Sequence, residues 1–172
     1  MTIYNILTLP NKILRQKSAP VKNIDEEIKT ILNNMAETMY DAPGIGLAAI
    51  QVGIRKRLVV IDCSRDADKK ELIKLINPEI LSKSDEENMY EEGCLSIPDI
   101  SEEVRRSSIC TIEYLDINGK KQKLKCEDLM ATCIQHEIDH LNGKLFIDHI
   151  SRLKREKIIR KFIKLSKQKL ST

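Results

Sequence analysis

The strongest constraint on the fold is the pattern His136-Glu137-Ile138-Asp139-His140, which lies in a segment predicted to be helical. Acidic residues at 127 and 128 favour a helix start there, and Gly143 favours its end. Residues four apart on a helix share one face, so both imidazoles can reach a single cation. Two of the chain's three histidines fall in this pattern. It therefore predicts a metal-binding helix, the alternative being an ordinary helix face with two solvated histidines.

A catalytic metal site needs a third protein ligand and an open position. The metzincin extension of the motif places a histidine at the position of Phe146, which cannot bind a metal. The only downstream glutamate, Glu156, lies among Lys and Arg residues and is better explained as their solvated partner. This leaves an upstream cysteine. Cys94 follows a glycine and precedes a proline, so a loop can present it, although alone it is better explained as a small buried hydrophobic residue.

Hydrophobic periodicity predicts two further helices. Apolar residues recur at helical spacing from Ile24 to about Tyr40. A second stripe runs through the very basic segment 150–170, whose apolar residues are Leu153, Ile158, Ile159, Phe162, Ile163 and Leu165. The sequence therefore predicts a basic C-terminal helix in addition to an amphipathic helix near the N-terminus.

Short runs rich in β-branched residues predict strands at Leu58–Ile61 and Leu72–Ile76, the second ending at Asn77-Pro78. Segments 108–115 and 120–125 alternate around Asn118-Gly119, which predicts a β-hairpin. We therefore expect an α+β fold of mostly antiparallel strands around the central HExxH helix. At 172 residues, the chain is expected to form a single domain spanning 1–172.

Composition excludes several classes of protein. A net charge of +3 is too small to favour nucleic-acid binding over the whole surface. No apolar run approaches the about 20 residues of a membrane span, and the N-terminus lacks a signal-peptide pattern, so a cytoplasmic location and no membrane partner are expected. The five cysteines are odd in number and lack C-x-x-C spacing, which predicts free thiols.

Three ordered blocks resemble the defining motifs of the peptide deformylases. They are G-I-G-L-A-A-I-Q at Gly44–Gln51, E-G-C-L-S at Glu92–Ser96 and Q-H-E-I-D-H-L at Gln135–Leu141. The first block alone fits a helix-terminating turn equally well, and it lacks the residues of a phosphate loop. Three motifs in order are far more specific than any one of them.

The resemblance implies a metal held by Cys94, His136 and His140. Sulfur and nitrogen ligands suit Fe(II), Zn(II), Ni(II) or Co(II), and the family commonly uses Fe(II). The resemblance further implies that Glu137 is the general base for a metal-activated water. It assigns the oxyanion donors to the Gln51 side chain and the Leu95 backbone N–H.

The implied reaction removes the formyl group from N-formylmethionyl nascent peptides and releases formate. The peptide is expected to run along Ile45 and Gly46 as an added strand. Leu129, Thr132 and Cys133 share the face of His136 and are expected to line the methionine pocket, although core packing explains them equally well. Many bacterial members carry an arginine at the position of Ser101, which leaves recognition of the downstream peptide open.

In relatives the C-terminal helix contacts the ribosome, and the basic composition of segment 150–170 suits phosphate attraction. A solvated helix face explains this composition equally well. Two alternative functions remain: an HExxH endopeptidase, or a non-catalytic ribosome- or RNA-binding module with a structural metal, for which His149 or another cysteine would be the fourth ligand. The identity of the metal, the oligomeric state and a bacterial or organellar source remain open.

Overall fold

The computed structural model describes residues 2–64 and 68–171. Within these residues the chain forms three α-helices and seven β-strands. The helices are α1 (Glu26–Asp41), α2 (Asp128–Leu141) and α3 (Arg152–Leu170). The strands are β1 (Gly46–Ala48), β2 (Leu58–Ile61), β3 (Ile73–Lys83), β4 (Glu87–Cys94), β5 (Ile97–Ser107), β6 (Ile109–Leu115) and β7 (Lys121–Glu127).

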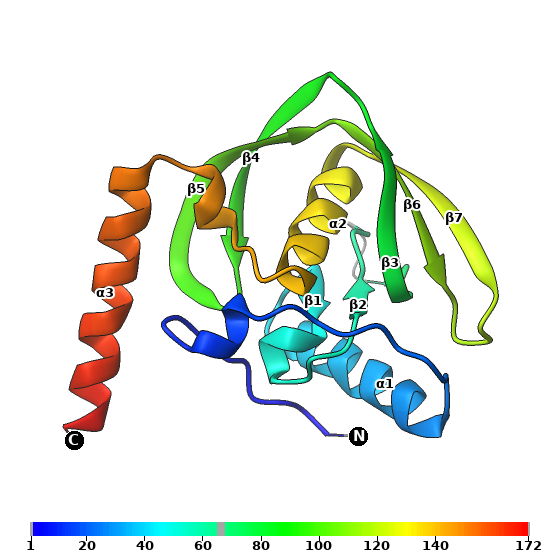
Figure 1. Cartoon of the computed structure of the whole chain (residues 1–172), viewed down its shortest axis with the longest axis horizontal. Coiled ribbons are helices and arrows are strands. Elements are labelled where there is room, and N and C mark those ends of the chain that lie inside the picture. Colours follow the sequence, from blue (N-terminus) through cyan, green and yellow to red (C-terminus); the bar gives the residue numbers. More distant parts are fainter. Residues whose placement is uncertain (1, 65–67, 172) are drawn as a thin grey trace.

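The strands form two antiparallel sheets, one with the order β1-β2-β3-β6-β7 and one made of β4 and β5. Figure 1 shows α2 in the middle of the molecule with strands of both sheets around it, α1 below the larger sheet and α3 at one side. Apolar residues of α2, including Ile134 and Leu141, pack in one core cluster with residues of β2, β3, β6 and β7. The predicted α+β architecture around the HExxH helix is therefore confirmed.

The helix boundaries follow from local capping. The Asp25 side chain accepts a hydrogen bond from the Ile28 backbone N–H, so α1 begins after Asp25, two residues later than the apolar pattern suggests. At the C-terminal end of α2, Gly143 has φ +74°, and its N–H donates to the His140 carbonyl. A left-handed glycine ends the helix there, as predicted.

The predicted end of the second strand at Asn77-Pro78 is wrong, because β3 continues to Lys83. β3 pairs with β2 as far as Ile76 and with β6 again from Glu79, with an irregularity between these two residues. Asn77 has φ +51°, and its side chain bonds to both backbone polar groups of Val21. The proline thus lies in a bulge, where its missing N–H interrupts no regular ladder.

The hairpin of β4 and β5 was not predicted. Its sequence is rich in acidic residues and lacks a clear apolar alternation, so the usual strand signal is weak. The two strands nevertheless pair regularly from Glu87↔Ser107 to Gly93↔Ser101. Cys94 is consequently the last residue of a strand, and not a loop residue as expected.

The predicted apolar stripe of the C-terminal helix is only partly correct. Ile158 and Phe162 are buried in a cluster with Leu145 and Phe146, but Leu153 is 80% exposed, and Ile163 and Leu165 are also exposed. Two buried residues therefore attach α3 to the rest of the molecule. Among the described helices, none has the length and apolar character required to cross a membrane.

Candidate functional site

Helix α2 brings two imidazoles together on one buried face. His136 Nε2 and His140 Nε2 lie 3.2 Å apart, and Cys94 Sγ lies 3.3 Å from His140 Nε2. One ligand atom from each of the three residues lies within 4.8 Å of the others. The sulfur comes from the end of β4, more than forty positions earlier in the chain than the histidines. The fold therefore brings the cysteine next to two residues that are far from it in the sequence.

This donor set fits a transition metal. Burial lowers the pKa of His140 well below its ordinary value, so its ring is neutral and has a lone pair to offer. Both Nε2 atoms face each other and the thiol sulfur, a mixed N and S environment typical of Fe or Zn sites. The arrangement leaves room for a fourth, non-protein ligand, because the cavity described below opens onto His136.

A buried ionic network orients the first histidine. His136 Nδ1 lies 2.9 Å from Glu92 Oε2, so the opposite ring nitrogen is turned toward Cys94 and His140. Arg106 donates to both carboxylate oxygens of Glu92, and its Nη1 donates to Asp139 at 2.8 Å. Sequence reasoning missed this network. The place of Glu92 in the cysteine motif was the available signal, whereas nothing local marks Arg106.

Glu137 projects into the same site from α2. Its side chain is buried, and Oε2 has no hydrogen-bond partner among the residues that the structure describes. Burial and the nearby charge of Glu92 raise the pKa of Glu137 to about 7, against the opposing effect of His136. A carboxyl group in this state can both accept and return a proton near neutral pH.

Gly46 makes room for this carboxylate. A Cβ atom at position 46 would lie 2.5 Å from Glu137 Oε1 and 3.0 Å from Cys133 Sγ. Any larger residue would therefore displace the glutamate or the cysteine. The glycine motif and the HExxH motif thus meet at one point in space.

Gln51 is held with its amide N–H groups toward the cysteine. Its Oε1 accepts from the Ala48 backbone N–H at 2.9 Å, which fixes the orientation of the amide. Its Nε2 then donates to Ser96 Oγ at 3.1 Å and lies 3.6 Å from Cys94 Sγ. A side-chain donor is thus positioned beside the sulfur of the candidate metal-binding group.

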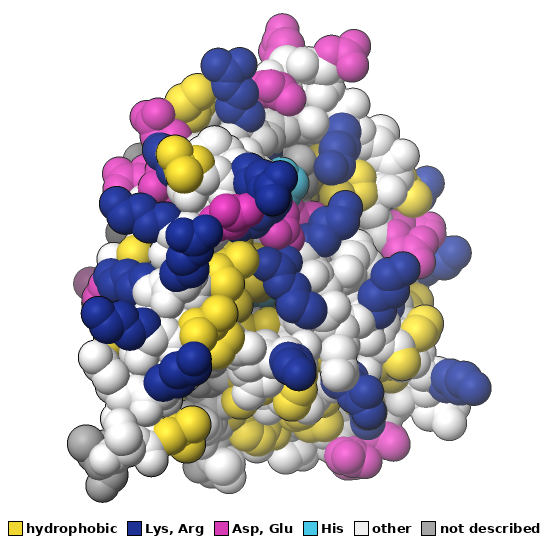
Figure 2. All heavy atoms as spheres, turned by 60° about the vertical axis from the view of Figure 1, so that its left-hand side comes forward, with side chains coloured by type: hydrophobic (Ala, Val, Ile, Leu, Met, Phe, Trp, Pro, Cys, Tyr) yellow, Lys and Arg dark blue, Asp and Glu magenta, His cyan; other side chains and the backbone are white. Residues whose placement is uncertain are grey.

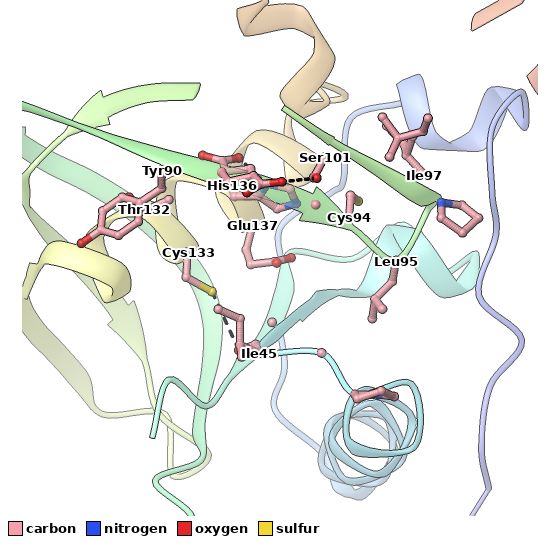
Figure 3. A pocket seen from close by; sticks show the side chains of 18 of the residues that line it. Ile45, Tyr90, Cys94, Leu95, Ile97, Ser101, Thr132, Cys133, His136 and Glu137 are labelled. Atoms are coloured by element: carbon pink, nitrogen blue, oxygen red, sulfur yellow. Dashed lines mark hydrogen bonds and ion pairs between the residues drawn. The ribbon is translucent and has the colours of Figure 1, made fainter. Parts of the chain in front are cut away.

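These groups line a cavity of about 750 Å³. Its walls include every predicted substrate-contacting residue, namely Ile45, Gly46, Gln51, Leu95, Leu129, Thr132 and Cys133. In Figure 3, Glu137 and His136 lie in the middle, with Tyr90 and Thr132 on one side and Cys94 and Leu95 on the other. The cavity has the volume of a small-ligand or peptide site.

Comparisons with known proteins show the family to which the chain belongs. A family model described as polypeptide deformylase matches residues 3–156. The chain belongs to the polypeptide deformylase family. Peptide deformylases are metal-dependent hydrolases that remove the formyl group from nascent peptides, and membership assigns this reaction class to the chain.

Relatives match over nearly the full length. The peptide deformylase of Rhizobium meliloti is 54% identical over 167 residues, which are 97% of this chain and 96% of the relative. That of Pelagibacter ubique is 54% identical over 170 residues, with 99% of each chain covered. A solved peptide deformylase from Legionella pneumophila has 46% identity and a TM-score of 0.89, with 99% of each chain covered. The enzyme from Ehrlichia chaffeensis in complex with actinonin has 37% identity and a TM-score of 0.89, with coverage of 94% of this chain and 96% of that one.

The alternative ligands considered from the sequence have other partners. His149 Nε2 lies 2.7 Å from Asp139, and the group formed by Cys94 and the two motif histidines does not include it. Glu156 pairs with Arg152 and Arg160 on α3, as a solvated partner in a basic helix would. His149 therefore does not support a closed four-ligand site, and Glu156 does not support a protease that takes its third ligand from a downstream glutamate.

Ser101 occupies the position at which the family resemblance leads us to expect an arginine, and its hydroxyl contacts a carboxylate. Ser101 Oγ donates to Glu91 Oε1 at 2.6 Å, and both residues line the cavity. The rim therefore presents a carboxylate, and none of the lining residues is Lys or Arg.

Proposed function

We propose that this chain hydrolyses N-formylmethionyl peptides to formate and a free N-terminal amine, with Cys94, His136 and His140 as the metal ligands. The observation that carries the proposal is their convergence at a peptide-sized cavity, beside the buried carboxylate of Glu137, whose Oε2 has no hydrogen-bond partner within 2–64 and 68–171. No contact or distance among the described residues favours the two alternatives, an HExxH endopeptidase and a non-catalytic module with a structural metal.

Fe(II) is the metal we propose first, and Zn(II), Ni(II) and Co(II) also suit one thiolate and two imidazoles. When bound, the metal supplies Lewis-acid activation of the attacking water and of the formyl oxygen. Glu92 supports the ligand set, because its contact with Nδ1 fixes the His136 ring.

Glu137 serves as the general base and then as the general acid. It accepts a proton from the water that attacks the formyl carbon and passes it to the nitrogen of the leaving amine. A pKa of about 7, raised by burial, makes both transfers feasible near neutral pH.

Gln51 and Leu95 stabilise the developing oxyanion. The Gln51 Nε2 group is preorganised by the Ala48 contact and lies beside Cys94, so donation costs little reorganisation. The Leu95 backbone N–H, which directly follows Cys94, supplies the second donor.

The peptide extends β1, which is an edge strand of the larger sheet. Ile45 lies directly before that strand and is 43% exposed, and Gly46 begins it, so backbone groups there can pair with substrate. The side chain of the first residue then enters the part of the cavity lined by Leu129 and Cys133.

The test is formate release from formyl-Met-Ala-Ser by protein purified without oxygen. We expect formate from the wild type, and loss of both bound metal and formate in Cys94→Ser. Internal cleavage of unformylated peptides would favour the endopeptidase. Metal-loaded, folded protein that releases no formate would overturn the proposal.

We further propose that α3 docks on the ribosome, where formylated chains emerge, and that the protein acts in the bacterial cytoplasm. The bacterial origin of the relatives supports this location. Figure 2 shows Lys and Arg side chains spread over the side of the molecule that carries α3. Lys157, Lys161 and Lys164 are exposed there, and cations in such an array attract phosphates.

Deleting α3 would be a poor test, because Ile158 and Phe162 pack in the core. Replacing Lys157, Lys161 and Lys164 by Gln keeps that packing and should weaken ribosome binding, with hydrolysis of a short formyl-peptide unchanged. The control replaces three lysines of the β6–β7 hairpin, at 120, 121 and 123. Equal ribosome affinity in both triple variants would refute the docking proposal.

A further inference from the structure

Four of the five cysteines gather in one part of the core. All five lie among the described residues and are free thiols. Cys110, Cys126 and Cys133 belong to one buried cluster, and Cys63 packs against it. The fifth, Cys94, belongs to the candidate metal-binding group. Neighbouring thiols can be joined by oxidation, so the cluster is a place to look for reversible thiol chemistry.

Strand alternation turns Cys63 toward α2. Val59 and Ile61 on β2 pack in the same cluster as Cys133 of α2. Side chains two residues apart on a strand point to one face, and Cys63 continues this alternation just beyond the end of β2. The thiols of Cys63 and Cys133 are hydrogen-bonded to each other.

A backbone contact holds the two residues near each other. The Asp62 backbone N–H, which directly precedes Cys63, donates to the Ile45 carbonyl at 2.9 Å. Cys133 Sγ lies 3.8 Å from the same oxygen, a contact that Figure 3 shows as a dashed line. The end of β2 and the cavity face of α2 therefore meet at one carbonyl group.

The two thiols differ in access. Cys63 is partly exposed, whereas Cys133 is buried and its side chain lines the substrate cavity. The contact with Cys133 lowers the pKa of Cys63, against the opposing effects of burial and of the Asp62 carboxylate. A partly exposed thiol of this kind reacts first, and a buried neighbour can then displace the group that it has taken up.

The second pair of neighbouring thiols in the cluster lacks this access. Cys110 and Cys126 are direct partners in the ladder of β6 and β7, and both are buried. An oxidant would have to open the sheet to reach either sulfur. This pair therefore serves as an internal control for the more accessible one.

We propose that Cys63 and Cys133 form a thiol-oxidation site that reacts with small-molecule disulfides, and that the resulting bond between them inhibits the enzyme. The Cys63 thiolate attacks one sulfur of the small disulfide, whose S–S bond breaks, and the first small thiolate leaves and takes up the proton that Cys63 released. The Cys133 thiol then loses its proton and attacks the Cys63 sulfur of the mixed disulfide. The second small thiolate leaves and takes up that proton. In total the protein loses two electrons and two protons, and the small disulfide gains them.

The new bond should distort the substrate cavity. It requires the two sulfurs to lie about 2.05 Å apart, much closer than in a hydrogen bond, so Cys133 Sγ must move toward Cys63. A Cβ atom at Gly46 would lie 3.0 Å from Cys133 Sγ and 2.5 Å from Glu137 Oε1, so this movement takes place beside the glutamate. We expect kcat/KM to fall by about tenfold, because small displacements around reacting groups are costly. This loss rests on the proposed function, whereas formation of the bond does not.

The test treats the Zn(II)-loaded protein with oxidised glutathione, since zinc itself has no redox chemistry. Intact mass and a disulfide map should show one bond, between Cys63 and Cys133, with bound zinc unchanged. Formate release from formyl-Met-Ala-Ser should fall and should recover with dithiothreitol. Cys63→Ser should release formate like the untreated wild type and should resist the oxidant. The matched control Cys110→Ala removes a buried thiol of the same cluster and should remain as sensitive as the wild type.

The outcomes separate this inference from the proposed function. A map without the bond between Cys63 and Cys133 would overturn the inference, and it needs no variant. Equal inhibition of Cys63→Ser and the wild type would also overturn it, because another thiol would then be responsible. A complete bond with unchanged kcat/KM would refute the inhibition. Absence of formate release before oxidation would overturn the proposed function, and the map would still decide whether the pair reacts.

Discussion

Replacing Gly46 by Ala should impair the reaction with little damage to the fold. The added Cβ would lie 2.5 Å from Glu137 Oε1, whereas ordinary van der Waals contact begins at 3.4 Å. The carboxylate oxygen must therefore move by about 0.9 Å. A misplacement of about 1 Å in a catalytic group costs on the order of a hundredfold in rate, so we expect a loss of that size in kcat/KM.

The effect on stability should be modest. Gly46 has a negative φ, so alanine suits its backbone, and the remaining strain comes from the 3.0 Å approach to Cys133 Sγ. Overpacking of this kind costs about 1–3 kcal/mol. The amount of bound metal should not change, because none of the three proposed ligands is displaced.

The assay is formate release from formyl-Met-Ala-Ser, with metal content and urea unfolding measured on the same preparation. Gly93→Ala is the matched control, because a Cβ there would have its nearest neighbour at 3.7 Å, an ordinary contact. Near-wild-type kcat/KM in Gly46→Ala would refute the claim that the position of Glu137 governs the rate. Loss of metal in that variant would show that the substitution acts through the ligands.

Three further predictions concern other parts of the molecule. Glu92→Gln should weaken metal binding by about tenfold to a hundredfold in a chelator competition, and unchanged affinity would contradict an orienting role. Burial raises the pKa of Asp62, but hydrogen bonds, including one from the Tyr40 hydroxyl, together lower it below its ordinary value. Asp62→Asn should therefore lower the free energy of unfolding by about 2 kcal/mol at pH 7. Urea titrations should show that this loss shrinks below about pH 4, where the carboxylate of the wild type becomes protonated. A loss that does not depend on pH would contradict the prediction. Glu91 and Asp99 are exposed carboxylates that line the cavity. They should raise kcat/KM for a formyl-peptide with lysine in third position about threefold above that for the peptide with glutamate there. Glu91→Gln should reduce this ratio of kcat/KM values, and an unchanged ratio would contradict the role of Glu91.

The sequence allowed the helix with the two candidate metal ligands to be predicted, because the information for it is local. The spacing of His136 and His140 by itself places both rings on one face, and the nearby glycine at 143 marks the end of the helix. The β6–β7 hairpin was predictable for the same reason, since the Asn118-Gly119 turn and two alternating segments adjoin each other.

The rest of the site depends on contacts between distant segments. Glu92 and Arg106 are fourteen positions apart on β4 and β5, and their charged sequence hides both strands until the pairing is seen. Reasoning from residues alone favoured a merely hydrophobic role for Cys94, because no local pattern shows that β4 ends beside α2. The resemblance to the deformylases named Cys94 as a ligand, but only the fold explains how its sulfur reaches His140.

The most direct test of the account is formate release by Glu137→Gln beside the wild type, both purified without oxygen and matched in bound metal. Glutamine keeps the size of the side chain and leaves the three proposed ligands in place, but it cannot serve as a general base. We predict formate release by the wild type and a loss of at least about a hundredfold in the variant. Comparable rates at equal metal content would contradict the role of Glu137 as the general base.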